Sequence, residues 1–217
     1  MSNKQKNTNM SKIAIIFGII SFVILAYIAF VVVFAVSKST YLKTDDGKET
    51  NYFKKLGTIH YRQADNVFSL IYNPVSGANA KTFKPIDYSF GKDKKHIFYR
   101  DTKQPHVDYA TFEITAEGVI RDKNHVYEIE RYNLAAIEGA DPKTFEIIFH
   151  GIGKDDKYVY YGTKRQPHVD CKTFEVIIEK YKTTSGESER LQTVRDKNHE
   201  YETDWKQQML VPVKTSL

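Results

Sequence analysis

An uncharged stretch near the N-terminus stands out from the alternating polar and apolar positions of the rest of the chain. Residues 13–36 contain no charged side chain. A helix of about 24 residues, rising about 1.5 Å per residue, is long enough to cross a bilayer with some tilt. Apolar residues cover every face of such a helix, which is not the pattern of a soluble surface helix. The stretch therefore predicts a single transmembrane helix at 13–36.

A cleavable signal peptide is the alternative for this stretch. Its apolar core would cover only about 7–15 residues before a small-residue cleavage site, so we expect an uncleaved anchor instead. The preceding residues 1–12 are polar and carry three lysines and no acid, whereas the other flank carries mixed charges. This asymmetry predicts a cytoplasmic tail at 1–12 and an extracytoplasmic C-terminal domain, in a single-pass protein of the cytoplasmic membrane.

The remainder of the chain repeats a pattern about every thirty residues. A basic residue and Asp precede a few polar residues, then a β-branched residue and an aromatic one; after a loop, Asn or Asp stands three residues before a Thr–Phe pair. Such self-similarity indicates a repeat fold. The recurring positions are Asp93, Asp122, Asp155 and Asp196; Tyr127 and Tyr160; Asp108, Asp141 and Asp170; and Phe83, Phe112, Phe145 and Phe174.

The residue types at these recurring positions, the columns of the repeat, predict the local structure of each repeat. Aspartate followed by polar residues specifies a turn into a strand, because its carboxylate accepts hydrogen bonds from nearby backbone N–H groups. Asp141-Pro142-Lys143-Thr144 suits one capped helical turn, with proline at the first helical position. We expect the following phenylalanine to dock each turn onto the core. The predicted fold is mainly β, with two or three short antiparallel strands and one helical turn per unit.

Composition changes along the chain predict the domain boundaries. Residues 37–58 are polar and predict a stalk, with a first strand beginning near Tyr52, and the repeat domain covers 59–205. Residues 182–192 break the period and predict an insertion loop. Residues 206–217 form a predicted C-terminal tail, in which Pro212 disfavours a central strand. The pattern is compatible with a closed, propeller-like array and with an open one.

The charge of the chain is concentrated at its N-terminal end. The net charge is +5, but residues 39–217 contain 28 basic and 27 acidic residues. A nearly neutral outer domain argues against nucleic acid as a partner, because nucleic-acid binding usually requires a basic face.

Three stretches carry a resemblance to a known family. Asp-Lys-Asn-His-Val-Tyr at 122–127, Asp-Lys-Asn-His at 196–199 and Ala-Asp-Pro-Lys-Thr-Phe at 140–145 resemble the DKNYY repeat family, over about residues 60–205. The family consists of bacterial envelope proteins of unassigned activity, so the resemblance implies a repeat fold and an envelope location but no catalytic residues. The first unit has Arg62-Gln63 in place of basic–Asp, and Glu200 replaces an apolar residue in the last. These units resemble degenerate caps.

Histidine and aspartate residues are the candidates for a metal site. His96, His125 and His199 share one repeat column, and His106 and His168 share another within Gln-Pro-His-Val-Asp. Metal ligands must converge, whereas these columns place one residue in each unit, so we expect turn or surface roles unless the array curves into a ring. Calcium is disfavoured because the Gly and terminal Glu of a twelve-residue calcium loop are absent. We expect no metal and no cofactor.

Catalytic signatures are also lacking in the sequence. A glycosidase needs a unique pair of carboxylates, whereas the same aspartate recurs in every unit, and no nucleophile elbow, phosphate loop or zinc-protease motif occurs. Cys171 is the single cysteine of the chain and therefore has no intrachain partner. Tyr109 and Pro142 occupy the equivalent position in other repeats, which favours a space-filling role over a disulfide between chains.

The expected function is a binding or structural role at the bacterial cell envelope, with an envelope protein or glycan as partner. An envelope hydrolase acting on glycans is the alternative. Enzyme sites break repeat symmetry, so the test is whether polar residues that occur once, such as Glu138, His150 and Trp205, gather in one pocket.

Overall fold

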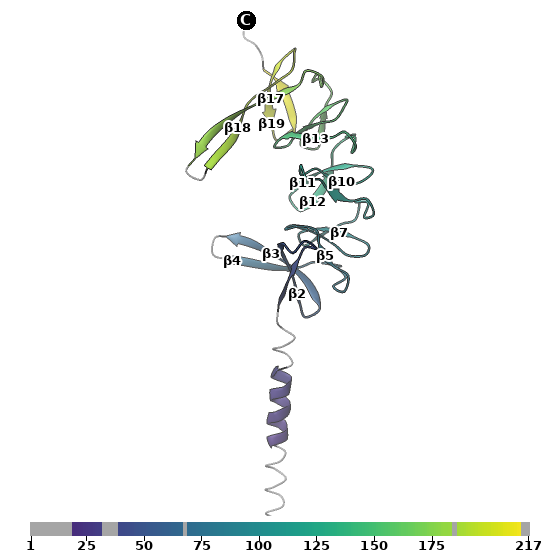
Figure 1. Ribbon diagram of the computed structural model, residues 1–217, viewed down its shortest axis with the longest axis vertical. Coiled ribbons are helices and arrows are strands. Elements are labelled where there is room, and N and C mark those ends of the chain that lie inside the picture. Colours follow the sequence, from purple (N-terminus) through teal and green to yellow (C-terminus); the bar gives the residue numbers. More distant parts are fainter. Residues whose placement is uncertain (1–18, 32–38, 67–68, 184–185, 214–217) are drawn as a thin grey trace, which may run out of the picture. The chain divides into compact units, whose positions relative to one another are not determined.

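The computed structural model describes residues 19–31, 39–66, 69–183 and 186–213 (Figure 1). The chain divides into two compact units, Met1–Ser89 and Phe90–Leu217. Strands dominate both, so the prediction of a mainly β fold is confirmed.

Residues 19–31 are helical, and their side chains are exposed. The predicted transmembrane helix covered 13–36, of which residues 13–18 and 32–36 lie outside the described residues, as does the predicted tail at 1–12. In the part of the chain that the structure describes, no helix is both long and apolar enough to cross a membrane.

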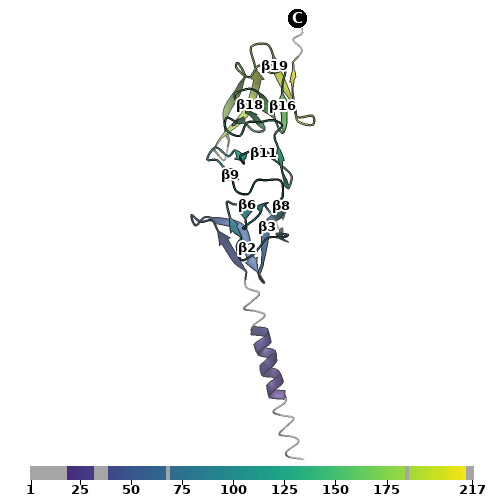
Figure 2. The same cartoon turned by 90° about the vertical axis from the view of Figure 1, so that its right-hand side faces the viewer.

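The described strands form five antiparallel sheets of four strands each, and within every sheet the spatial order follows the chain (Figures 1 and 2). The first sheet contains β1 (Thr40–Lys43), β2 (Glu49–Lys55), β3 (Thr58–Asn66) and β4 (Ser69–Pro74). The second contains β5 (Lys84–Pro85), β6 (Phe90–Lys92), β7 (Ile97–Tyr99) and β8 (Thr102–Gln104). The third contains β9 (Glu113–Ile114), β10 (Ile120–Arg121), β11 (Val126–Glu130) and β12 (Asn133–Ala136).

The fourth sheet contains β13 (Glu146–Phe149), β14 (Ile152–Lys154), β15 (Val159–Tyr161) and β16 (Lys164–Gln166). The fifth contains β17 (Glu175–Thr183), β18 (Gly186–Arg195), β19 (Glu200–Asp204) and β20 (Met209–Pro212). Each repeat therefore supplies four strands, rather than the two or three that the sequence predicted. Apart from β11, the strands from β5 to β16 are only two to four residues long, which is too short to show a clear alternation of polar and apolar positions.

The hydrophobic core of the second unit lies between successive sheets. One cluster joins Val126 of the third sheet to Phe145 and Tyr160 of the fourth repeat. A second cluster joins Val159 and Phe174 to Leu210 of the last sheet. A small sheet of short strands cannot bury its apolar face alone, and stacking the repeats supplies the missing partner surface.

The predicted stalk at 37–58 is instead part of the first sheet where it is described. Residues 40–43 and 49–55 form β1 and β2, and Tyr52 and Phe53 are buried. The strand expected near Tyr52 is β2, and the Tyr52 ring packs against Tyr61 and Phe83 at centroid distances of 5.1 and 5.0 Å. The polar composition before Tyr52 concealed β1.

The residues predicted as an insertion loop, 182–192, largely extend a hairpin. β17 and β18 pair from Glu175↔Arg195 to Thr183↔Gly186, and Figure 1 shows this hairpin projecting from its sheet. Opposite charges face each other across it, in the pairs Glu179–Arg190 and Lys180–Glu189. Such cross-strand pairs stabilise a hairpin without an apolar core, which explains why its polar composition predicted a loop.

The predicted C-terminal tail, 206–217, contributes β20, the edge strand of the last sheet. Leu210 is fully buried there. Pro212 ends the strand at the sheet edge, a position where a missing N–H group costs no ladder hydrogen bond.

Candidate functional site

In three of the repeats, one buried aspartate accepts hydrogen bonds from two backbone segments and from a tyrosine hydroxyl. Oδ1 of Asp122 accepts the N–H groups of Asn124 and His125 at 2.7 and 2.9 Å, which fixes the turn into β11. Oδ2 accepts the hydroxyl of Tyr127 at 2.6 Å and the N–H of Asp108 at 2.8 Å. Asp155 with Tyr160, and Asp196 with Tyr201, repeat this arrangement, which we call the Asp–Tyr clasp.

Electrostatics of the clasp favour an ionised aspartate beside a neutral tyrosine. Burial alone would raise the pKa of Asp196, but three backbone N–H groups and the Tyr201 hydroxyl outweigh it and lower the pKa to about 2. Burial likewise opposes ionisation of Asp122 and Asp155, and the equivalent donors in their own repeats outweigh it and lower the pKa of each carboxyl. Burial and the adjacent carboxylate raise the pKa of the tyrosines. Each carboxylate oxygen is already occupied by two donors, so the clasps are structural.

The first two repeats depart from the clasp. The first has Arg62-Gln63 in place of the basic–Asp pair. Asp93 is buried and accepts the N–H groups of Lys95 and His96, but Phe98 replaces the tyrosine and has no hydroxyl to donate.

The second aspartate column lies at the start of short turns that are more exposed than the clasps. Oδ1 of Asp108 accepts the N–H groups of Ala110 and Thr111, while Asp141 and Asp170 accept those of Lys143 and Thr173. The carbonyl of Asp141 also accepts the N–H of Phe145 at 3.0 Å, so the expected helical turn is a single hydrogen-bonded turn. The phenylalanines that follow are buried at 83, 145 and 174, whereas Phe112 remains partly exposed against Phe90.

The Gln-Pro-His-Val-Asp motif joins neighbouring sheets. The side-chain amide of Gln104 donates to the carbonyl of Tyr132 at 3.0 Å and accepts the N–H of Leu134 at 2.9 Å. Nε2 of His106 lies 2.6 Å from the carbonyl of Leu134, an oxygen that can only accept, so Nε2 carries the proton. Gln166 and His168 make the equivalent contacts to the backbone of Gln208 and Leu210.

The remaining histidine column shows no convergence. His96, His125 and His199 follow Asp93, Asp122 and Asp196, each in the turn of a different repeat. Among the described residues, no group of three or more His, Cys, Asp or Glu side chains is placed to hold a metal ion. Cys171 is half-buried, and its Sγ lies 3.4 Å from the carbonyl of Asp155.

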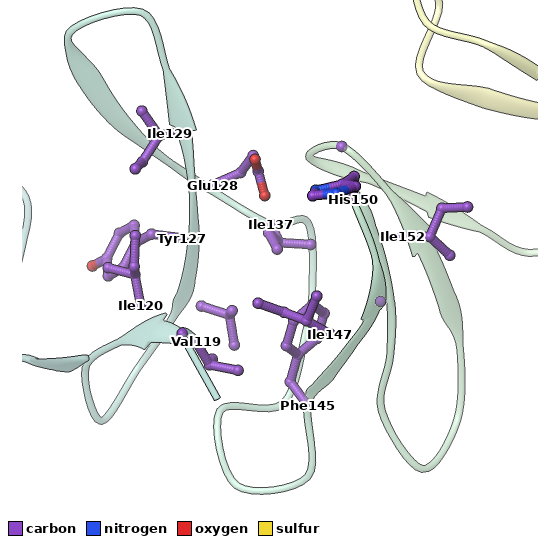
Figure 3. Close-up of a pocket in the computed structure, with 15 residues that line it drawn as sticks. Val119, Ile120, Tyr127, Glu128, Ile129, Ile137, Phe145, Ile147, His150 and Ile152 are labelled. Atoms are coloured by element: carbon purple, nitrogen blue, oxygen red, sulfur yellow. The ribbon is translucent and has the colours of Figure 1, made fainter. Parts of the chain in front are cut away.

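A pocket of about 230 Å³ lies between the third and fourth sheets, within the second unit. Figure 3 shows apolar side chains lining most of it, with Glu128 and His150 facing each other. The hydroxyl of Tyr127, which also lines the pocket, belongs to the clasp with Asp122. Glu128 belongs to β11, and His150 lies in the β13–β14 turn with its ring edge against Phe149. The apolar wall consists of Val119, Ile120, Ile129, Ile137, Phe145, Ile147 and Ile152.

Glu128 is the unusual group of this pocket. Burial, followed by the nearby charge of Glu130, raises the pKa of its carboxyl, and the N–H of Ile129 only partly offsets this. No lysine, arginine or histidine among the described residues forms an ion pair with it. The equivalent positions in other units hold Tyr99, Tyr161 and the exposed Glu202, so the pocket breaks the symmetry of the array.

The family comparison agrees with the repeat geometry. A model of the DKNYY family matches residues 3–131 and again 60–205. The chain belongs to the DKNYY family. No curated protein and no solved structure matches it. The two DKNYY matches together include the apolar stretch, all four units with a basic–Asp pair and the pocket between the third and fourth sheets.

Sequence reasoning located the DKNYY columns but missed the pocket. Of the three unrepeated polar residues singled out, His150 lines it, while Glu138 and Trp205 are exposed elsewhere. Glu128 went unnoticed, although it stands at a position that holds Tyr99 and Tyr161 in the repeats on either side of it. The exact duplication of Gln-Pro-His-Val-Asp was likewise a signal for a shared contact, and only its histidine was considered.

Proposed function

We propose that this DKNYY protein is a membrane-anchored, extracytoplasmic repeat domain that binds a ligand at the bacterial cell envelope. The uncharged stretch at 13–36 and its lysine-rich N-terminal flank support an anchor with the N-terminus in the cytoplasm. The family match begins at residue 3, so the stretch lies within the residues that the family model matches.

The observation that carries a binding role is the pocket at Glu128. The repeated polar side chains of the clasps and of the Gln-Pro-His-Val-Asp motif are engaged in bonds within the fold. A carboxylate held among apolar side chains without a cationic partner costs stability, and nothing in the architecture of the sister repeats requires it. A concave apolar site with a few polar groups is the usual form of a ligand pocket.

A glycan hydrolase is the weaker alternative. Glycoside hydrolysis uses two carboxyl groups about 5–9.5 Å apart on either side of the scissile bond. Among the described residues that line the pocket, Glu128 supplies a carboxylate and no second acid accompanies it. A binding role requires only one.

The location is tested with alkaline phosphatase, which is active only outside the cytoplasm, fused to the C-terminus of the full chain. We expect the fusion to be active and to sediment with membranes, because 13–36 would remain attached as an anchor. A matched fusion placed directly after residue 12 should be inactive. An inactive C-terminal fusion contradicts the orientation, and an active but soluble one contradicts the uncleaved anchor.

The binding role is tested by native mass spectrometry of the full-length protein released from its own membranes. Ile147 lines the pocket and is 47% exposed, so Ile147→Trp should fill the pocket without disturbing the core. We expect a small molecule that accompanies the wild-type protein and is reduced at least tenfold in Ile147→Trp. Val211→Trp, at a similarly exposed position outside the pocket, is the control. Equal retention by all three proteins would exclude this pocket as the binding site.

A further inference from the structure

We propose that the pocket at Glu128 takes a protonated amine with an apolar body of about six carbon atoms. This inference rests on the proposed binding function and specifies its ligand class. It stands on the shape of the cavity, the chemistry of its wall and the position of its single carboxylate.

A cation is the ligand group that best complements the carboxylate. Glu128 is half-buried in β11 beside Val126, Tyr127 and Ile129, where water solvates it poorly. An ammonium group would restore the lost solvation with charge-assisted hydrogen bonds, which are shorter and stronger than neutral ones. A ligand carboxylate would instead meet a like charge, and a neutral ligand would leave Glu128 without a counter-ion.

His150 is compatible with the same head group. Its ring faces Glu128 across the pocket in Figure 3. A neutral imidazole has one nitrogen that accepts a hydrogen bond, and an ammonium group has several protons to donate. An ammonium group in the space between the two side chains could donate to the Glu128 carboxylate and to this nitrogen of His150.

The walls select the apolar body. Phe145 and Ile137 are buried at the base, and Ile147 and Ile129 are partly exposed nearer the solvent. Each methylene group that leaves water should raise the affinity about fourfold. A volume of about 230 Å³ accommodates a short alkyl chain or one phenyl ring, but not a polymer segment.

The test uses the full-length protein in lipid nanodiscs, with n-hexylamine, n-hexanol and hexanoate as probes and empty nanodiscs as the background. Binding is followed by saturation-transfer NMR at neutral pH. We expect saturable binding of hexylamine at least tenfold tighter than that of hexanol, and no binding of hexanoate. Glu128→Gln, which keeps the shape of the side chain, should lower hexylamine affinity at least tenfold and leave hexanol unchanged. Glu202→Gln, in the same repeat column but exposed, should change neither.

Two outcomes separate failure of the ligand class from failure of the site. If hexanol binds as tightly as hexylamine and Ile147→Trp abolishes both, the pocket binds ligands but the amine assignment is overturned. If no probe saturates the wild-type protein above empty nanodiscs, the amine assignment is also overturned, and the co-purification experiment decides the binding role separately. A melting temperature of Glu128→Gln that is not below that of the wild type verifies that a lost affinity does not reflect unfolding.

Discussion

Replacing Phe174 with alanine should lower the free energy of unfolding by about 3–5 kcal/mol, the usual cost of removing a buried phenylalanine ring. Phe174 is 7% exposed and belongs to the cluster that joins the last two sheets through Val159, Tyr201 and Leu210. The cavity would lie in the cluster that joins the fourth and fifth sheets. Removing the ring therefore weakens the contact between sheets as well as the local turn.

Phe112 provides the matched control for this substitution. It occupies the same repeat column, but it is partly exposed and packs against Phe90 at a centroid distance of 5.8 Å. Part of its ring already contacts solvent, so Phe112→Ala should cost clearly less than Phe174→Ala. Urea denaturation of the full-length variants, followed by circular dichroism, measures both. A loss below 1 kcal/mol for Phe174→Ala, or equal losses at the two positions, would refute the role of Phe174 as a buried anchor.

Local chemistry explains which parts of the fold the sequence predicted. Asp122 and its sister residues specify turns through hydrogen bonds to N–H groups only two and three residues away. Such contacts are visible in a sequence because the carboxylate and its donors recur together. The period itself revealed that the units stack, since each carries an aromatic anchor that a single small sheet cannot bury.

Contacts between repeats were not predictable in the same way. Gln104 bonds to Leu134, thirty residues further on, and the polarity of the two segments gives no sign of this pairing. The β17–β18 hairpin is stabilised by ion pairs between strands, so its composition resembles that of a loop. The environment of Glu128 depends on the β13–β14 turn of the next sheet. Tertiary context decided all three features.

Removing the carboxylate of an Asp–Tyr clasp should be as damaging as removing an anchor ring. In Asp196→Ala, the N–H groups of Asp170, Asn198 and His199 and the hydroxyl of Tyr201 all lose their acceptor. A buried donor without a partner costs about 1–3 kcal/mol. Water can reach some of these groups, so we expect a total loss of about 3–5 kcal/mol, the range seen when one member of a buried charged network is removed.

The pH dependence of stability distinguishes the charge of the clasp from its shape. Asp196 has a pKa of about 2 in the folded protein, because its four donors outweigh the effect of burial, and an aspartate in an unfolded chain has a pKa of about 3.9. A folded-state pKa below the unfolded value means that the stabilisation is fully present above about pH 4 and is lost as the pH falls through 2. Asp196→Asn keeps the shape but cannot ionise, so this acid-dependent loss should be smaller in the variant.

The measurement is the free energy of unfolding of wild type, Asp196→Asn and Asp156→Asn between pH 2 and pH 5. Asp156 is exposed and lies next to the clasp residue Asp155, so its substitution controls for the removal of one negative charge. We expect Asp156→Asn to follow the wild-type curve and Asp196→Asn to be less stable above pH 4, with a smaller difference near pH 2. Parallel curves for wild type and Asp196→Asn would show that ionisation of Asp196 does not stabilise the fold, and the clasp would then act through neutral hydrogen bonds alone.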